Sequence, residues 1–320
     1  MSMNTTNPAQ GAKRWTADLI PDQTGRTFIV TGANSGLGYA TTRELARRGA
    51  HVVMAVRDEA KGRRALEEIQ AGAGRPVSLE LRRVDLADLD SVRRFAEGLL
   101  ADGTDVDVLV NNAGIMMPPR SLSPQGHESQ FAANHLGHFA LTGLLLDVIA
   151  AGRDPRVVTV SSTLHRQGRI RYDDLTGARS YSPISFYAQS KFANVLFGLE
   201  LDRRLKAAGS PVRSLLAHPG YSDTNLQTTG PTGLMRSIMR IGNRFYAQHA
   251  DVGALSQLYA ATDPGARGGE FIGPDGWAEN RGHPTVVRPV RPATDPADAR
   301  RLWGLSEELT GVRYGLPPAS

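Results

Sequence analysis

Short valine-rich runs alternate with helical patterns from residue 27 to residue 217 of this chain. The predicted strands are 27–31, 51–56, 77–84, 106–111, 156–161 and 212–217, with 269–273 as a weaker seventh. Several are continuous apolar runs, which is typical of strands buried on both faces of a parallel sheet. Because strand, helix and strand follow one another, we predict a single α/β domain whose doubly wound parallel sheet (a Rossmann fold) has about seven strands.

The composition excludes several classes of site. The 320 residues contain no cysteine, so disulfides, thiolate zinc sites and cysteine nucleophiles are ruled out. The net charge is +5 and the arginines are scattered, which indicates a solvated surface and no nucleic-acid partner. The polar N-terminus has no apolar signal-peptide core, and the apolar run 136–150 is too short for a membrane span. We predict a buried core helix there, and a cytoplasmic protein without a membrane anchor.

Two segments depart from the alternating pattern. Residues 1–23 are polar and are predicted to form a flexible N-terminal arm before a domain over 24–320. Residues 221–250 read as a loop and then an amphipathic helix, which could cover a substrate. The alternative is that the apolar side chains of this segment pack on the core. Those side chains are Leu234, Met235, Ile238, Met239 and Ile241.

A strand, a glycine turn and a helix follow one another in "TFIVTGANSGLGYATTRELA". The three glycines remove side chains where the backbone turns tightly, approaches a pyrophosphate and packs helix on strand. The helix starting near residue 37 would direct its free N–H groups at the phosphates. No Gly-Lys-Ser/Thr ends the turn, so a mononucleotide P-loop is excluded. The predicted cofactor residues here are Gly32, Asn34, Ser35, Gly36, Leu37 and Gly38; the alternative is a purely structural turn.

The end of the second strand indicates which dinucleotide binds. An acidic residue there would bind the ribose 2′-hydroxyl of NAD, and an arginine would accommodate the 2′-phosphate of NADP. The chain has Arg57 at this place and Asp58 after it, and neighbouring residues of a strand face opposite sides. We favour Arg57 and therefore NADP over NAD. The alternative is that Arg57 only ends the strand in solvent.

Tyr187 and Lys191 are four residues apart in a helical pattern and therefore share one face. A tyrosine hydroxyl has an ordinary pKa of about 10, and a nearby ammonium favours the phenolate. We therefore expect Lys191 to lower the pKa of Tyr187 towards the range of efficient acid–base catalysis. Only four of the 37 basic residues are lysines, and a compact ammonium also suits a ribose hydroxyl.

Small polar residues follow two of the predicted strands. Ser161 and Ser162 end one of them, at the carboxyl edge where open α/β sheets bind ligands, so that a serine hydroxyl there could hold a substrate oxygen. The sequence "LVNNAG" ends the strand before it, and Asn134 lies in a helix interior that its amide does not favour.

Taken together, these motifs resemble the short-chain dehydrogenase/reductase family over roughly residues 25 to 275. The matches are T-G-x-x-x-G-x-G at 31–38, Asp85-Leu86, N-N-A-G at 111–114, Asn134, Ser162, Y-x-x-x-K at 187–191 and Pro219-Gly220. "GANSGLG", "NHLGHFALT" and "YAQSKFANVLF" are most similar to the retinol-dehydrogenase-like branch, which generally uses NADP. The resemblance implies hydride transfer between NADP(H) and an alcohol or carbonyl on an apolar small molecule.

The resemblance also implies a role for each matching residue. Tyr187 would be the general acid–base, and Lys191 would lower its pKa and bind the nicotinamide ribose. Ser162, with Ser161 as the alternative, would orient the substrate oxygen, and Asn134 would hold a water of a proton relay. Further cofactor contacts would come from Asp85, Leu86, Asn112, Ala113, Gly114, Pro219, Gly220 and Thr224. Family resemblance favours a homodimer or homotetramer built on the helices that carry 134–150 and 186–205.

Three further features of the sequence bear on this interpretation. Residues 166–185 lengthen the interval between Ser162 and Tyr187, and are expected to shape the substrate mouth. His135 and His138 could share a metal, but no carboxylate set accompanies them, so no metal site is predicted. The rival functions are a non-catalytic NADP-sensing or scaffold protein on the same fold and a sugar-nucleotide epimerase, whose glycine turn has a different spacing.

Overall fold

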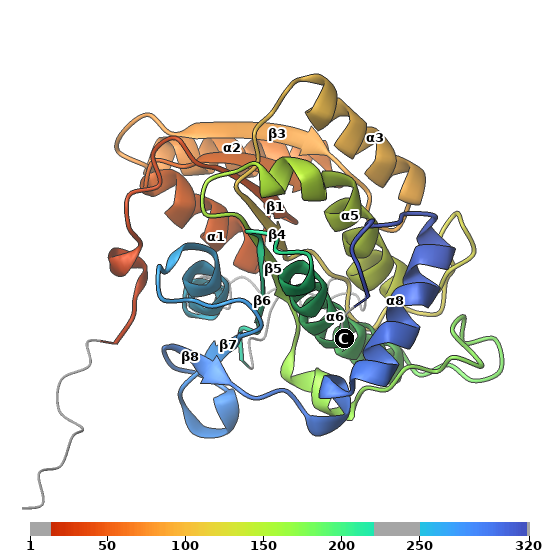
Figure 1. Cartoon of the computed structure of the whole chain (residues 1–320). Coiled ribbons are helices and arrows are strands. Elements are labelled where there is room, and N and C mark those ends of the chain that lie inside the picture. Colours follow the sequence, from red (N-terminus) through yellow and green to blue (C-terminus); the bar gives the residue numbers. More distant parts are fainter. Residues whose placement is uncertain (1–13, 221–249, 319–320) are drawn as a thin grey trace, which may run out of the picture.

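The computed structural model describes residues 14–220 and 250–318 of the chain (Figure 1). Within them lies one eight-stranded sheet in the order β3-β2-β1-β4-β5-β6-β7-β8. The strands are β1 Thr27–Thr31, β2 His51–Val56, β3 Ser78–Arg83, β4 Val108–Asn111, β5 Arg156–Val160, β6 Arg213–Ala217, β7 Phe271–Pro274 and β8 Pro284–Val287. All neighbouring strands are parallel except β7 and β8. The predicted doubly wound parallel sheet is confirmed.

The eighth strand is the one that the sequence analysis did not find. β8 is four residues long, lies at the edge of the sheet and pairs antiparallel with β7. It begins at Pro284, and proline within a run argues against a strand because it cannot donate to the ladder. A proline is tolerated here because it is the first residue of an edge strand.

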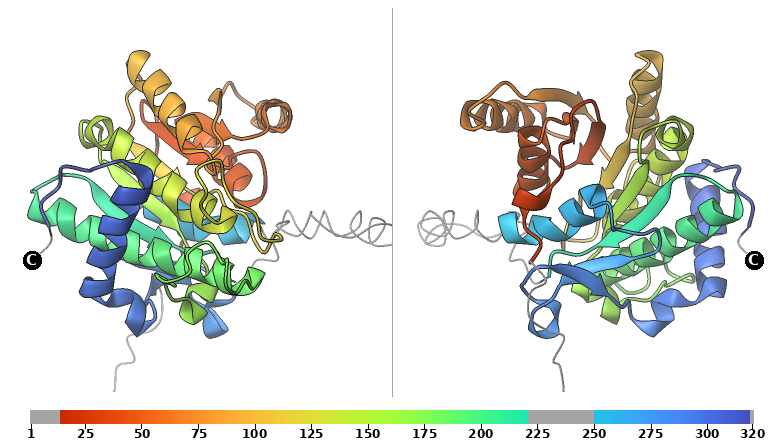
Figure 2. Two further views of the ribbon diagram at one scale, coloured as in Figure 1. Left: turned by 90° about the vertical axis from the view of Figure 1, so that its right-hand side faces the viewer. Right: turned by 60° about the vertical axis from the view of Figure 1, so that its left-hand side comes forward.

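Two layers of helices cover the sheet (Figure 2). The helices α1 Gly36–Arg47 and α2 Glu59–Gly72, with helical residues 250–262, pack on one face. The helices α3 Leu89–Ala101, α5 Gly137–Ala150 and α6 Pro183–Ala207 pack on the other, and α8 Pro296–Thr310 lies against α5 and α6. α5 is the buried core helix that was predicted over 136–150. None of the described helices has the length and apolar content needed to cross a membrane.

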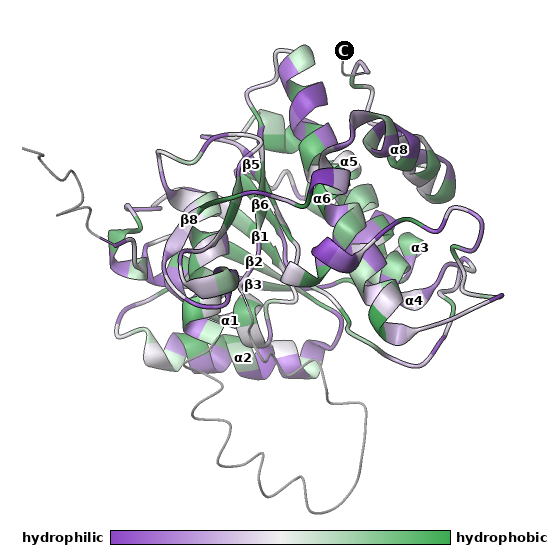
Figure 3. Cartoon of the chain, turned by 90° about the horizontal axis from the view of Figure 1, so that it is seen from below, coloured by the Kyte–Doolittle hydropathy of each residue, from purple (hydrophilic) through white to green (hydrophobic). Residues whose placement is uncertain are grey.

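Alternating side chains of the central strands supply both halves of the core. Phe28 and Val30 of β1 belong to the cluster with α1 and α2, and Ile29 between them belongs to the cluster with α3 and α5. Successive residues of a strand point to opposite faces, so a strand covered on both faces must be apolar at every position. Figure 3 shows the hydrophobic colours gathered on these central strands.

The chain packs against the domain well before residue 24. Trp15 and Ile20 are buried in the same cluster as β1, and Trp15 Nε1 donates to Asp263 at 2.8 Å. The prediction of a flexible arm is therefore wrong for residues 14–23. An indole buries a large apolar area, and its N–H has found an acceptor far along the chain. Residues 1–13 lie outside the described part of the structure.

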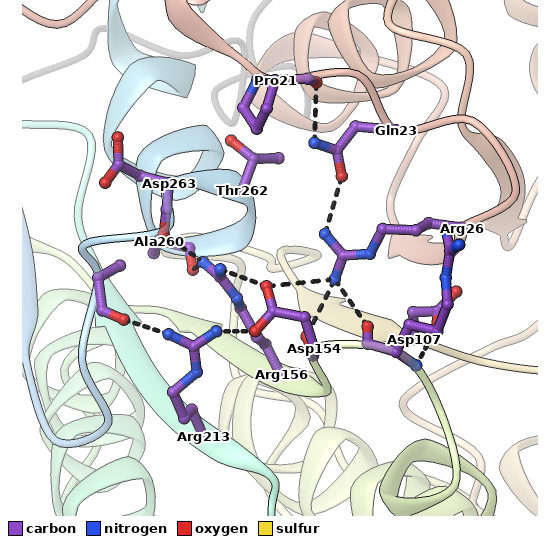
Figure 4. A network of polar contacts seen from close by, with 12 residues as sticks. Pro21, Gln23, Arg26, Asp107, Asp154, Arg156, Arg213, Ala260, Thr262 and Asp263 are labelled. Carbon is purple, nitrogen blue, oxygen red and sulfur yellow. Dashed lines mark hydrogen bonds and ion pairs between the residues drawn. The ribbon is translucent and has the colours of Figure 1, made fainter.

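An ionic network lies at the amino edge of the sheet, where β5 and β6 begin (Figure 4). Arg156, the first residue of β5, is completely buried, and its guanidinium contacts Asp154 at 2.6 Å and the carbonyl oxygen of Ala260 at 2.9 Å. Arg213, the first residue of β6, also pairs with Asp154. Burial lowers the pKa of Arg156 to about 10. Arg156 thereby joins the start of β5 to helical residues 250–262, and Arg213 joins the start of β6 to the carbonyl oxygen of Ala266, so both arginines stabilise the framework at the amino edge.

The packing of α1 on β1 gives a first test. A Cβ added to Gly38 would lie 2.2 Å from the carbonyl oxygen of Gly32, whereas one added to Gly304 in the interior of α8 would meet nothing within 4 Å. We expect Gly38→Ala to lower the free energy of unfolding by about 1–3 kcal/mol through overpacking. Gly304→Ala, the matched control, should raise it by about 0.5–1 kcal/mol. Urea unfolding of both variants measures this, and equal stability of the two would contradict the packing.

Candidate active site

The glycine turn leads from the carboxyl end of β1 into α1. Gly32 and Gly36 have φ of +68° and +53°, in the left-handed region that favours glycine. Gly38 packs against the carbonyl group of Gly32, so the helix lies directly on the turn. Asn34 is half-buried, while Ser35 and Gly36 are exposed at the start of α1. An open cradle at a helix N-terminus fits the pyrophosphate of a dinucleotide.

The turn after β4 is bonded to the end of β1. The Asn112 amide donates to the carbonyl oxygen of Thr31 at 2.7 Å, and the Thr31 hydroxyl accepts from the backbone N–H groups of Asn112 and Ala113, both at 2.9 Å. Asn112 also accepts from the side chain of Gln257 at 3.2 Å. Two of the predicted cofactor residues therefore hold the loops after β1 and β4 together.

Gly114 marks the place where this turn meets α6. A Cβ added there would lie 3.3 Å from Asn134 Oδ1 and 3.4 Å from Lys191 Nζ. The Asn134 amide accepts from the N–H of Ile115 at 2.8 Å and donates to its carbonyl oxygen at 2.9 Å. The missing side chain thus lets the backbone at 114 lie against both polar groups. Asn134, Gly114 and Lys191 are therefore neighbours.

Asn134 lies in a π-helical turn, where the sequence had predicted an ordinary helix interior. Residues Ala132–Leu136 form this turn between the short α4, Ser129–Phe131, and α5. π-Helical turns are rare and occur often at functional sites. The turn is buried throughout. From it, the Asn134 amide binds the backbone of Ile115 and also donates to the Ser190 hydroxyl of α6 at 2.9 Å.

Tyr187 and Lys191 share a buried face of α6. Their exposed fractions are 6% and 4%, and Lys191 Nζ lies 5.9 Å from the centre of the Tyr187 ring. Lys191 Nζ donates to the carbonyl oxygen of Val160, at the end of β5, at 3.1 Å. The two side chains share one helix face, as the spacing predicted, and Lys191 reaches the carboxyl end of β5.

The expected effect of Lys191 on Tyr187 is not what these surroundings produce. Burial raises the pKa of Tyr187 to about 12, and the Ser162 side chain acts against this rise. Burial likewise lowers the pKa of Lys191 to about 8. Desolvation disfavours the charged form of both groups. Spacing alone does not report burial, so the pKa of Tyr187 is raised where the sequence analysis expected it to be lowered.

The structure distinguishes the two serines at the end of β5. The Ser161 hydroxyl is buried and donates to the backbone carbonyl of Lys191 at 2.9 Å. Ser162 is only partly buried, interacts with Tyr187 and caps the 3-10 helix Thr163–Gln167 by accepting from the N–H of Leu164 at 3.2 Å. The hydroxyl beside Tyr187 is therefore that of Ser162, the residue that the resemblance favoured.

The ends of β2 and β3 place the residues expected near the adenosine. Arg57 is exposed, whereas the Asp58 carboxylate caps α2 by accepting from the N–H of Lys61 at 3.1 Å. Asp85 follows β3, half-buried, and accepts from the N–H of Ala87 at 3.0 Å. Leu86 is buried and packs against Gly137 at the start of α5. These residues lie at the carboxyl edge of the sheet, with the glycine turn.

Pro219 and Gly220 follow β6 and reach the same edge. A Cβ added to Gly253 would lie 2.8 Å from Leu37 and 3.2 Å from Pro219, so the glycine turn and this loop meet at helical residues 250–262. The segment predicted to cover the substrate spans 221–250, and all of it except residue 250 lies outside the described residues. Thr224 is part of this segment.

A polar group that the sequence analysis missed supports this loop. The His218 ring lies 2.9 Å from the carboxylate of Glu279, and its other nitrogen accepts from the N–H of Gly220 at 3.1 Å. Glu279 also pairs with Arg166, on the 3-10 helix that Ser162 caps, at 2.6 Å. Glu279 has φ of +57°, a strained conformation of the kind that clusters at functional sites. No spacing in the sequence signals a contact between residues this far apart.

Comparisons with known proteins agree with this geometry. A family model described as short chain dehydrogenase matches residues 26–233. Polyprenol dehydrogenase from Mus musculus is 41% identical, covering 93% of this chain and 87% of its own, and retinol dehydrogenase 12 from Bos taurus is 40% identical, covering 91% and 88%. The crystal structure of an uncharacterized protein from Mycobacterium paratuberculosis is 47% identical with a TM-score of 0.80, covering 95% and 100%. The chain therefore belongs to the short-chain dehydrogenase family, in its retinol-dehydrogenase-like branch, and is an oxidoreductase of the kind that uses NAD(P).

Proposed function

We propose that the protein transfers a hydride between NADP(H) and the carbonyl or alcohol group of an apolar small molecule. The observation that carries this proposal is the position of the Tyr187 phenol, beside Ser162 and on the same helix face as the Lys191 ammonium, which lies against Gly114. A buried phenol and ammonium with perturbed pKa values are typical of a catalytic site. A non-catalytic sensor or scaffold on this fold would have no need of them.

The cradle after β1 suits the diphosphate of the cofactor, and the turn after β4 suits its nicotinamide end. When bound, the dinucleotide supplies the hydride chemistry at its nicotinamide ring. Lys191 would donate to a ribose hydroxyl, since its ammonium lies beside the backbone of Gly114. The other residues proposed to hold it are Gly32, Asn34, Ser35, Gly36, Leu37, Gly38, Arg57, Asp85, Leu86, Asn112, Ala113, Pro219, Gly220 and Thr224.

The cap of α2 supports NADP over NAD. The Asp58 carboxylate accepts from the backbone of Lys61 and lies 3.5 Å from the Lys61 ammonium, so its charge is used within its own helix. It is therefore poorly placed to bind a ribose 2′-hydroxyl. Arg57, exposed at the end of β2, is free to turn towards a 2′-phosphate, which a guanidinium binds through two parallel hydrogen bonds.

Tyr187 is proposed to exchange the proton of the reaction. Its raised pKa keeps the phenol protonated at neutral pH, which is the form needed to give a proton to a carbonyl oxygen during reduction. Ser162 would hold that oxygen. The side-chain amide of Asn134 already forms hydrogen bonds with Ile115 and Ser190. A water of the proton relay would therefore have to bind the backbone of Asn134.

The mouth of the site supports an apolar substrate. Gln130 accepts from the N–H of Met117 at 2.8 Å and donates to the carbonyl oxygen of Pro183 at 3.0 Å, which brings the loop after β4 to the start of α6. Met117 and Ile184 are among the exposed large hydrophobic side chains, and Ile184 lies one helical turn before Tyr187. The polyprenol and retinol dehydrogenases among the relatives are named for long apolar alcohols. The cytoplasmic location and the homo-oligomer stay predictions from the sequence.

Replacing the phenol tests the proposed reaction. We expect Tyr187→Phe to bind NADPH as the wild type does, because the ring remains, and to lose about 10²–10⁴-fold in turnover with apolar aldehydes. Tyr172→Phe is the matched control, since that hydroxyl bonds to Asp298 on α8. NADPH oxidation followed by absorbance measures both variants. Wild-type turnover in Tyr187→Phe, or no turnover in the wild type with any aldehyde or alcohol, would sink the enzymatic proposal.

Replacing Arg57 tests the choice of cofactor. Arg57→Ala should weaken NADPH binding by roughly tenfold to a hundredfold, the strength of a hydrogen bond to a charged group, and leave NADH binding almost unchanged. Arg64→Ala removes another exposed arginine, on α2, and controls for net charge. Titration calorimetry with both dinucleotides gives the ratio. Equal losses for NADPH and NADH would contradict the proposed contact between Arg57 and the 2′-phosphate, and with it the choice of NADP.

Replacing Lys191 tests the cost of burying its charge. Its pKa falls from 10.5 to about 8 on folding, so at neutral pH the buried ammonium destabilises the protein by roughly 3 kcal/mol. Between pH 8 and pH 10.5 the unfolded chain holds this proton and the folded chain does not, so stability rises with pH. Lys191→Met should therefore be more stable than the wild type at pH 7, and the difference should vanish near pH 10.5.

The backbone around Lys191 tolerates this change, because the Asn194 amide also donates to Val160, at 3.2 Å. Lys206→Met, which removes an exposed ammonium from the same helix, controls for net charge. Urea unfolding across this pH range measures the difference. A Lys191→Met protein that is less stable than the wild type at pH 7 contradicts the desolvation cost.

A further inference from the structure

We propose that His138 is a positioning residue for the dinucleotide site, which holds the end of β1 and the Asn134 turn together through one fixed neutral tautomer. The inference rests on the proposed function only in that the site it supports is the cofactor site. His138 lies in the first turn of α5 with an exposed fraction of 1%. Its Nδ1 is 3.0 Å from the backbone oxygen of Asn134, and its Nε2 is 2.9 Å from the Thr31 hydroxyl.

The two partners determine which ring nitrogen carries the proton. A carbonyl oxygen can only accept, so Nδ1 must be the donor to Asn134. Burial, helped by the nearby charge of Lys191, lowers the pKa of His138 to about 4, so the ring is neutral at physiological pH. A neutral imidazole has one donor and one acceptor nitrogen. Nε2 is therefore the acceptor, and the Thr31 hydroxyl donates to it.

This arrangement uses the full capacity of the Thr31 hydroxyl. The oxygen accepts the N–H groups of Asn112 and Ala113 and gives its own proton to His138. The other acceptor within reach is the Val110 carbonyl oxygen, at the longer distance of 3.3 Å. The imidazole thus directs the Thr31 proton away from the two amides and leaves both lone pairs of the oxygen to receive them.

On its other side, His138 joins a chain of contacts that ends at Tyr187. The Asn134 amide donates to the Ser190 hydroxyl, which donates to the backbone carbonyl of Tyr187 at 2.8 Å. Thr31, Asn134 and Ser190 are all completely buried. This series of contacts therefore holds the glycine turn and the Tyr187 turn at a set distance.

His135 provides a matched control three residues earlier. It is equally buried, and burial lowers its pKa to about 3. Its Nε2, however, is 2.9 Å from the Ser306 hydroxyl of α8, and its ring stacks on Phe131 at 5.1 Å between ring centres. The two histidines lie three residues apart, His135 in the π-helical turn and His138 in α5, and share burial and charge state. Only His138 reaches the residues around the cofactor cradle.

The test compares His138→Phe with His135→Phe. The His138→Phe variant should bind NADPH about tenfold more weakly, the worth of a buried hydrogen bond, with a further fall in kcat. The His135→Phe variant should bind NADPH within about twofold of the wild type, whatever its unfolding midpoint. His138→Gln, which keeps a polar group near Nε2, should recover part of the affinity. Equal NADPH affinity of the two phenylalanine variants would overturn the proposal.

A double-mutant cycle and a spectrum of the wild type keep the test open if His138→Phe fails to fold. Thr31→Val and Thr31→Val/His138→Gln should bind NADPH equally, because the valine already removes the contact; independent, additive losses would overturn the role.

Nitrogen NMR of the ¹⁵N-histidine-labelled wild type should show His138 neutral and protonated at Nδ1. A ring protonated at Nε2 or at both nitrogens would also overturn it. Failure of the wild type to bind either dinucleotide would instead sink the proposed function, and the NMR result would stand apart from it.

Discussion

The site depends on the reversal of strand order between β1 and β4. From β1 the chain runs outward through β2 to β3, and β4 then lies on the other side of β1. The connecting helices cover opposite faces, and in open α/β sheets ligands bind at the carboxyl ends of the strands where the order reverses. The Thr31 hydroxyl joins the two loops at this point by accepting two N–H groups from the loop after β4. The glycine turn and the backbone beside Lys191 are thereby held in one frame.

Burial, more than attraction between charges, sets the protonation states in this frame. It keeps the Tyr187 phenol neutral and weakens the hold of Lys191 on its proton. A protonated phenol can act as an acid, and burial disfavours the phenolate that would act as a base. The same desolvation is a cost to stability. The buried ammonium is thus expected to be kept for catalysis at the expense of the fold.

The features that could be predicted from the sequence are local ones. Valine-rich runs gave the parallel strands, and the spacing of Tyr187 and Lys191 gave a shared helix face, because each depends on neighbouring residues alone. β8 was not predicted because its first residue, Pro284, argues against a strand. The burial of Trp15 depends on Asp263, 248 residues away, and the direction of the Tyr187 pKa depends on packing from several elements. Contacts between residues that are far apart in the sequence produce no periodic pattern in it, so sequence patterns do not predict them.

His138 combines both kinds of feature. It lies four residues after Asn134, and a helical side chain points back over the preceding turn, so a contact with the Asn134 backbone was within reach of a spacing argument. The contact with Thr31 was not, because 107 residues separate the two and the packing of α5 on the sheet brings them together. A valine at 31 would have nearly the same shape and would suit a buried strand equally well. It would remove the Thr31 acceptor of the Ala113 N–H and the donor to the His138 imidazole, at about 1–3 kcal/mol each, while the Asn112 N–H would keep its bond to the Val110 carbonyl oxygen at 2.9 Å. A hydroxyl at this position is therefore required by the site and not by the sheet.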